Sequence, residues 1–231
     1  MKIKNNIEFG TTIALWGQCP DRFLSQGYKD STSFEDKIKL ISKIKDIKGV
    51  DLYGDWDVNM ENVDKVKEIL GKYKLKTFIV TADLNSIPEF GKGSITSPYK
   101  KSRDLGLKKI YEAIDMADIL DCSMINIWLG QDGYDYSFQV DYLWAWQAII
   151  DALKISADYA LKKNIKIALE YKPREPRTNI FTASAAKMLF IINKWAMHLT
   201  LVDPTYSVWE HFLPCLRLLY TVGTGVKCIA L

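Results

Sequence analysis

Two kinds of segment alternate along this chain, and their alternation restricts the fold more than any other feature. Apolar runs rich in β-branched and aromatic residues have the pattern of strands buried on both faces. They are residues 7–16, 49–54, 76–81, 124–130, 165–171 and 198–203. Apolar stripes with a helical period lie between them, in residues 63–73, 110–120 and 143–160. This order predicts a parallel sheet whose strands are joined by helical crossovers.

Two common folds satisfy this alternation, an open doubly wound sheet and a closed barrel of eight strand–helix units. A dinucleotide-binding sheet would have a glycine-rich turn after its first strand, and the stretch ALWGQCPDRF at residues 14–23 lacks one. Long loops with polar and aromatic residues follow nearly every strand instead, as in barrels. We therefore expect an α/β fold, an incomplete (β/α)8 TIM barrel in which about six βα units are recognisable.

Composition favours one large soluble domain. The chain has 231 residues, of which 48% are hydrophobic, and we expect a single domain over residues 1–231 with residues 204–231 as an atypical tail. Its net charge is +3, with lysines interleaved among acidic residues, which disfavours a nucleic-acid partner. We find no signal peptide and no bilayer-spanning stretch, so we expect a cytoplasmic protein without a membrane partner. Four widely spaced cysteines without a CxxC pair predict free thiols.

Polar and aromatic residues close the predicted strands or open the loops after them. They are Trp16, Asp21, Tyr53, Asp55, Asp57, Thr81, Asp83, Trp128, Gln131, Asp132, Glu170, Lys172 and Asp203. In a barrel these positions converge on one mouth. An aspartate after a strand is often only a turn former or helix cap, which is the plainer interpretation of Asp57 and Asp83. It does not extend to Glu170, because glutamate is neither a preferred cap nor a strand residue.

Three of these loops resemble one known family. LEYKPREPR at residues 169–177 is similar to the Leu/Ile-Glu-Pro-Lys-Pro signature of the xylose isomerases. WLGQDGYDY at 128–136 resembles their tryptophan- and glycine-rich loop after the fourth strand. LWGQCPDRF at 15–23 resembles their first-strand tryptophan and the following Asp/Arg-Phe loop. In order and spacing, residues 8–203 thus resemble a xylose isomerase-like (AP endonuclease family 2) barrel.

The resemblance implies a catalytic pair, Glu170 and Lys172, with Glu170 and Asp203 as ligands of a divalent metal. A strand-end carboxylate in a dry barrel mouth suits a hard cation, and the resemblance implies one or two ions of Mg2+, Mn2+ or Co2+. The metal would polarise a sugar carbonyl while the Lys172 ammonium stabilises the developing oxyanion. Lys172 points to the same side of an extended chain as Glu170. A plain salt bridge between the two is the alternative interpretation.

Four further residues are candidates for substrate binding. Trp16 and Trp128 suit stacking on the apolar face of a sugar, although either could simply pack in the core. Gln131 is a candidate partner for a sugar hydroxyl. Arg177 could bind a substrate phosphate, or pair with Glu175 or lie on the surface.

The chain departs from the family pattern near its end. At VDPTY, residues 202–206, Asp203 stands where the isomerases have a glutamate and Tyr206 where they have a histidine, and related epimerases use an aspartate at this strand end. No strand pattern of the expected kind follows, so we expect a C-terminally truncated barrel. A frameshift or a truncated gene model is one hypothesis, which resequencing the locus would test. Uncovered sheet edges favour dimerisation, so a homo-oligomer is expected.

The sequence thus predicts a metal-dependent isomerase or epimerase of carbohydrate metabolism that acts on a monosaccharide or a related polyol or keto sugar. Its classification as an enzyme rests on the resemblance. Two alternatives stay open, a catalytically inactive barrel that binds a sugar or a partner without turnover, and a dehydratase of an inosose or a shikimate precursor. An apurinic-site nuclease is disfavoured, because two histidines cannot supply a histidine-rich zinc site.

Overall fold

Parallel strands form the centre of the protein in the computed structural model. It describes residues 8–18, 28–30, 32–175, 178–195 and 199–202, and the short strands at 217–218, 220–221 and 229–230. Six parallel strands lie side by side in chain order. They are β1 (Phe9–Thr12), β2 (Ile47–Tyr53), β3 (Lys76–Thr81), β4 (Met124–Trp128), β6 (Lys166–Glu170) and β9 (Leu199–Val202). The short strand β11 (Tyr220–Thr221) pairs antiparallel with β9.

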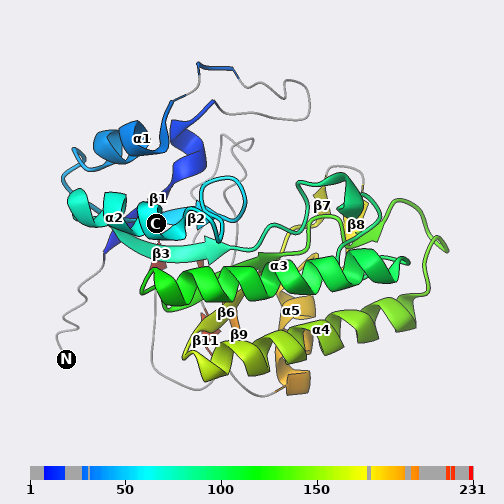
Figure 1. The fold of residues 1–231 in the computed structure, drawn as a ribbon. Helices are drawn as coiled ribbons and strands as arrows, with labels where there is room; N and C mark the ends of the chain where they lie inside the picture. The colour runs from blue at the N-terminus through cyan, green and yellow to red at the C-terminus, as the bar shows by residue number, and fades with distance from the viewer. Residues whose placement is uncertain are drawn as a thin grey trace.

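A helix follows each of the first five parallel strands. These are α1 (Phe34–Ile41), α2 (Val63–Lys72), α3 (Lys100–Ile119), α4 (Tyr142–Lys162) and α5 (Ala185–Trp195). Each of α1 to α4 contacts the next helix, so they form one layer outside the sheet (Figure 1). Within that layer α3 packs on β3 and β4, α4 packs on β6, and α5 packs on β9. The predicted strand–helix alternation is therefore confirmed.

Burial along the central strands shows which face the helices cover. Ile125 and Ile127 of β4, and Ile167 and Leu169 of β6, are at most 1% exposed and belong to the core shared with the helices. Because successive side chains of a strand point to opposite faces, Asn126 lies on the face of the sheet away from the helices. The polar side chains discussed below therefore project from the face that lines a barrel interior.

The two largest differences from the predicted boundaries lie in β1 and α3. The first predicted strand, 7–16, is shorter, because β1 ends at Thr12 and residues Ile13–Trp16 form a 3-10 helix. The tight turn folds Trp16 back so that its indole Nε1 donates to Thr11 Oγ1 at 3.2 Å. The helix predicted over 110–120 begins earlier, at Lys100. In the first half of this helix the buried residues are Ser102 and Gly106, so the sequence shows no apolar stripe there.

Two small sheets add to the main one. Strands β5 (Gly133–Tyr134), β8 (Thr178–Ile180) and β7 (Arg174–Glu175) form an antiparallel sheet that joins the loop after β4 to the loop after β6. Strands β10 (Arg217–Leu218) and β12 (Ile229–Ala230) pair within the predicted tail. The single domain over residues 1–231 stays a prediction.

No helix in the described part of the chain is long and apolar enough to cross a membrane. Cys122 is a free, buried thiol, as predicted for the cysteines, and the other three cysteines lie outside the described residues.

Candidate active site at the carboxyl ends of the strands

The carboxyl ends of β2, β3, β4 and β6 bring polar side chains to one edge of the sheet. Strand pairing fixes their level, since Tyr53 is the partner of Thr81, and Trp128 is the partner of Glu170. Thr81 is in turn the partner of Asn126, two residues before Trp128, and the ends of these four neighbouring strands lie around one mouth. Glu170, predicted to be the central residue of the site, is the last residue of β6.

The Glu170 carboxylate is held by a side chain from the neighbouring strand. Asn126 Nδ2 on β4 donates a hydrogen bond to Glu170 Oε2 at 2.6 Å, and a longer one to Thr81 Oγ1 on β3 at 3.5 Å. Asn126 is only 6% exposed, and its Oδ1 has no hydrogen-bond partner among the described residues. A polar link therefore crosses three neighbouring strands and ends on the carboxylate.

Lys172 lies next to Trp128, with its ammonium 5.3 Å from the ring centroid. Its Nζ also forms a 2.5 Å ion pair with Glu175 Oε2. Glu175 lies on β7, three residues after Lys172, and pairs there with Thr178 of β8. The Trp128 ring lies against Gly130, because a Cβ built on that glycine would be 2.7 Å from ring atoms. Trp128 Nε1 is buried and has no hydrogen-bond partner in the described part of the chain.

Tyr53, at the end of β2, adds a hydroxyl group to the same mouth. Its Oη donates to Asn85 Oδ1 at 2.5 Å, and its ring lies 5.6 Å from that of Trp56. Burial raises the pKa of the Tyr53 phenol above its usual value, and the carboxylates of Asp83, Glu170 and Glu175 raise it further. The hydroxyl therefore stays neutral, and it lies within the electrostatic influence of Glu170.

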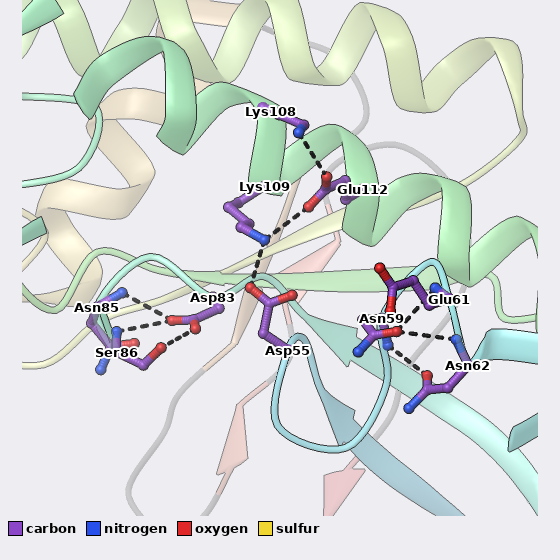
Figure 2. A network of polar contacts seen from close by, with 10 residues as sticks. All are labelled: Asp55, Asn59, Glu61, Asn62, Asp83, Asn85, Ser86, Lys108, Lys109 and Glu112. Atoms are coloured by element: carbon purple, nitrogen blue, oxygen red, sulfur yellow. Dashed lines mark hydrogen bonds and ion pairs between the residues drawn. The ribbon is translucent and has the colours of Figure 1, made fainter. Parts of the chain in front are cut away.

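The loop after β2 is fixed at both of its aspartates. Asp57 Oδ2 accepts a hydrogen bond from the Tyr53 backbone N–H at 2.9 Å. Asp55 has a positive φ of 61°, and its Oδ2 forms a 2.6 Å ion pair with Lys109 of α3. Figure 2 shows this ion pair between the loop and the helix. Both contacts restrict the backbone on which Tyr53 stands.

Asp83 organises the turn after β3. Its Oδ1 accepts from the backbone N–H groups of Asn85 at 3.2 Å and Ser86 at 2.9 Å, and its Oδ2 accepts from the Ser86 hydroxyl (Figure 2). This turn places the Asn85 side chain where it accepts the hydrogen bond from Tyr53 Oη. The plainer interpretation of Asp57 and Asp83 as turn formers is therefore confirmed.

Asp132 is fully buried and ties two loops together. It accepts hydrogen bonds from Ser94 Oγ at 2.5 Å and from the backbone and hydroxyl of Thr96, each at 2.7 Å. Burial raises the pKa of this carboxyl, although the hydrogen bonds oppose the shift. Gln131, a predicted substrate contact, is half-buried in the same turn.

The predicted site residues separate into three groups. Glu170, Lys172 and Trp128 lie at the mouth, on or beyond the adjacent ends of β4 and β6. Trp16 is half-buried and packs against the hydrophobic core, which agrees with its alternative interpretation as a packing residue. Arg177 and Asp203 lie outside the described residues, so their roles stay predictions.

The family of xylose isomerase-like TIM barrels matches residues 38–199, well over half of the chain. The chain belongs to this family. Its fold is accordingly that of a xylose isomerase-like TIM barrel.

Curated relatives are xylose isomerases. That of Thermus thermophilus is 33% identical over 133 residues, which are 57% of this chain and 34% of the relative. That of Fervidobacterium gondwanense is 24% identical over 152 residues, 65% of this chain and 33% of the relative. The chain thus spans about a third of the length of these relatives.

Solved structures show the same fold at low identity. The 3-keto-D-glucoside 4-epimerase of E. coli superposes with a TM-score of 0.65 at 14% identity, covering 86% of this chain and 68% of the epimerase. The D-psicose 3-epimerase of Clostridium cellulolyticum, solved with D-tagatose, gives 0.63 at 13%, covering 85% and 63%. A xylose isomerase-like TIM barrel protein of Mycobacterium smegmatis, solved with magnesium, gives 0.58 at 11%, covering 87% and 65%.

Oxygen donors at the mouth fit the divalent metal that this family implies. Glu170 offers a carboxylate at this mouth. Carboxylate oxygens are the hard ligand type that Mg2+ and Mn2+ prefer. Among the described residues no three His, Cys, Asp or Glu side chains form a cluster. A complete ligand set would therefore need residues beyond those described, and Asp203 is the predicted one.

Sequence reasoning missed Asn126, Asn85 and Glu175. One signal was present, because Asn126 interrupts the otherwise apolar strand MINIW at an inward-facing position. Asn85 left no local signal, since it reaches Tyr53 through the turn after β3, and Glu175 has several basic neighbours in the sequence with which it could pair.

Proposed function

We propose that this chain is a metal-dependent isomerase or epimerase of a monosaccharide or a related keto sugar. The proposal depends mainly on one observation, the Glu170 carboxylate at the end of β6 with the Lys172 ammonium in the loop that follows. Membership of the xylose isomerase-like family supports it, as do the sugar isomerases and epimerases among the similar proteins.

Glu170 and Asp203 would hold the cation. A divalent metal in this position supplies a Lewis acid that polarises a sugar carbonyl and its neighbouring hydroxyl. Asn126 Nδ2 donates a 2.6 Å hydrogen bond to the Glu170 carboxylate. The magnesium complex of the Mycobacterium smegmatis protein supports Mg2+ as one candidate.

Lys172 would stabilise negative charge as it develops on a substrate oxygen. Its ammonium is positioned between the Trp128 ring and the Glu175 carboxylate, so little reorganisation is needed when substrate binds.

Tyr53 and Asn85 would recognise a sugar hydroxyl. The Asn85 Nδ2 donor has no hydrogen-bond partner in the described part of the chain, and Tyr53 Oη can still accept a hydrogen bond. A substrate hydroxyl could therefore bridge them as donor and acceptor.

A sugar screen on the full chain tests this function. Aldoses, ketoses and 3-keto sugars would be incubated with Mn2+, Mg2+ or Co2+, and interconversion followed by NMR. We expect turnover that is abolished in Glu170→Ala and retained in Glu89→Ala, since Glu89 is an exposed carboxylate elsewhere in the chain. Saturable sugar binding without turnover would replace the enzyme with the sugar-binding alternative.

A further inference from the structure

Asn126 is an unusual residue for its position. It lies inside β4 between Ile125 and Ile127, which are fully buried, and it is itself only 6% exposed. Burying an amide is unfavourable unless both of its ends form hydrogen bonds. Only its nitrogen does so, and the oxygen is left without a partner among the described residues.

The orientation of this amide is determined by Glu170. Nδ2 donates to Glu170 Oε2 at 2.6 Å, and turning the amide over would bring its oxygen against the carboxylate oxygen. Two acceptors at that separation repel each other, so the amide keeps its nitrogen toward Glu170. Its oxygen is thereby left without a hydrogen-bond partner among the described residues. The longer 3.5 Å contact with Thr81 adds a second restraint on Nδ2.

We propose that Asn126 is a positioning residue, which fixes the Glu170 carboxylate for cation binding. Its hydrogen bond holds Oε2 at 2.6 Å and so restricts the rotation of the carboxylate. The inference rests on the proposed function, because it assigns Glu170 as the ligand. Groups that orient metal ligands in this way typically contribute 10- to 100-fold to metal affinity.

Substitution by leucine separates positioning from a structural role. Asn126→Leu removes the hydrogen bond and the orphaned oxygen together, with a side chain of similar size. We expect Mn2+ affinity, measured by titration calorimetry on the full chain, to fall by about 10- to 100-fold. The melting temperature of the metal-free protein should stay the same or rise, because a buried acceptor without a partner is gone.

Two further variants complete the test. Asn126→Ser keeps a polar group too short to reach Glu170, so it should also lose Mn2+ affinity, and it carries the test if the leucine variant does not fold. Thr77→Val is the matched control, because Thr77 Oγ1 is another buried group without a partner in the described chain, at the opposite end of β3 from Thr81. It should leave Mn2+ affinity unchanged.

The outcomes distinguish this inference from the proposed function. Unchanged Mn2+ affinity in both Asn126 variants, with a lower melting temperature, would give Asn126 a structural role only and overturn the inference alone. Absence of saturable Mn2+ binding in the wild-type chain would overturn the metal site itself, and the inference with it.

Discussion

The Lys172 ammonium lies over the indole ring of Trp128, 5.3 Å from the ring centroid. Trp128 ends β4 and Lys172 follows the end of β6, so the contact joins the ends of two neighbouring strands. The ring sits against Gly130, where any side chain would collide with it. The position of the ammonium thus depends on a glycine in a different loop.

Lys172→Met should lower turnover strongly while leaving the protein folded. Methionine keeps an apolar stem against Trp128 and removes the charge, and an ion pair in which Lys172 is 33% exposed contributes little to stability. Loss of an oxyanion-stabilising group typically lowers kcat by about 100- to 1,000-fold. Steady-state kinetics and thermal melting measure the two effects. Glu175→Gln is the control, since it removes the partner and keeps the ammonium, and equal losses in both variants would contradict the assigned role.

Gly130→Ala should displace Trp128. The new Cβ would lie 2.7 Å from two atoms of the indole, Cη2 and Cζ2, so the ring must move. Such overpacking costs about 1–3 kcal/mol of stability. Gly71→Ala is the matched control, because nothing lies within 4 Å of its added Cβ and alanine in a helix should stabilise by about 0.5–1 kcal/mol. Urea unfolding of both variants gives the comparison, and equal stabilities would show that the Trp128 ring accommodates a side chain at this position.

Much of the fold could be predicted because fully buried strands leave a local pattern. The run KTFIVT coincides with β3, Lys76–Thr81. The pattern fails where an apolar run does not form a strand. In IALW, Ile13 is buried while Leu15 is exposed, and the residues form a 3-10 helix despite their apolar character.

The site was only partly predictable for a related reason. Glu170 could be recognised because a carboxylate that ends an apolar strand is visible in a few residues of sequence. Its partner Asn126 lies 44 residues away, and their contact depends on strand register. Glu175 lies only three residues after Lys172, but Arg174 and Arg177 are also close to it in the sequence, so the sequence alone does not show which cation it pairs with. Contacts between strand ends are set by pairing, which a single sequence does not display.

Asp132 should make stability fall as pH rises through the acidic range. Burial raises its folded-state pKa above the ordinary value of 3.8, so the folded protein binds the proton more tightly than the unfolded chain does. Stability from this group is therefore greatest below the unfolded pKa and is lost as pH rises through the folded pKa. Asp132→Asn removes that titration and keeps a group that can bond Ser94 and Thr96. Urea unfolding from pH 3 to pH 8 should show a difference between the two proteins that changes with pH, and a constant difference would contradict the raised pKa.

Tyr53→Phe should weaken sugar binding without disturbing the fold. The variant removes the hydroxyl that donates to Asn85 and keeps the ring that lies 5.6 Å from that of Trp56. A neutral hydrogen bond contributes about 0.5–1.5 kcal/mol, so we expect KM for the sugar to rise by about 2- to 10-fold with a smaller change in kcat. Tyr111→Phe is the control, because Tyr111 lies on α3 and packs against Tyr159 rather than at the mouth. If both variants keep the wild-type KM, the hydroxyl of Tyr53 has no part in binding, and the sugar must be held by the other side of the mouth, around Trp128 and Lys172.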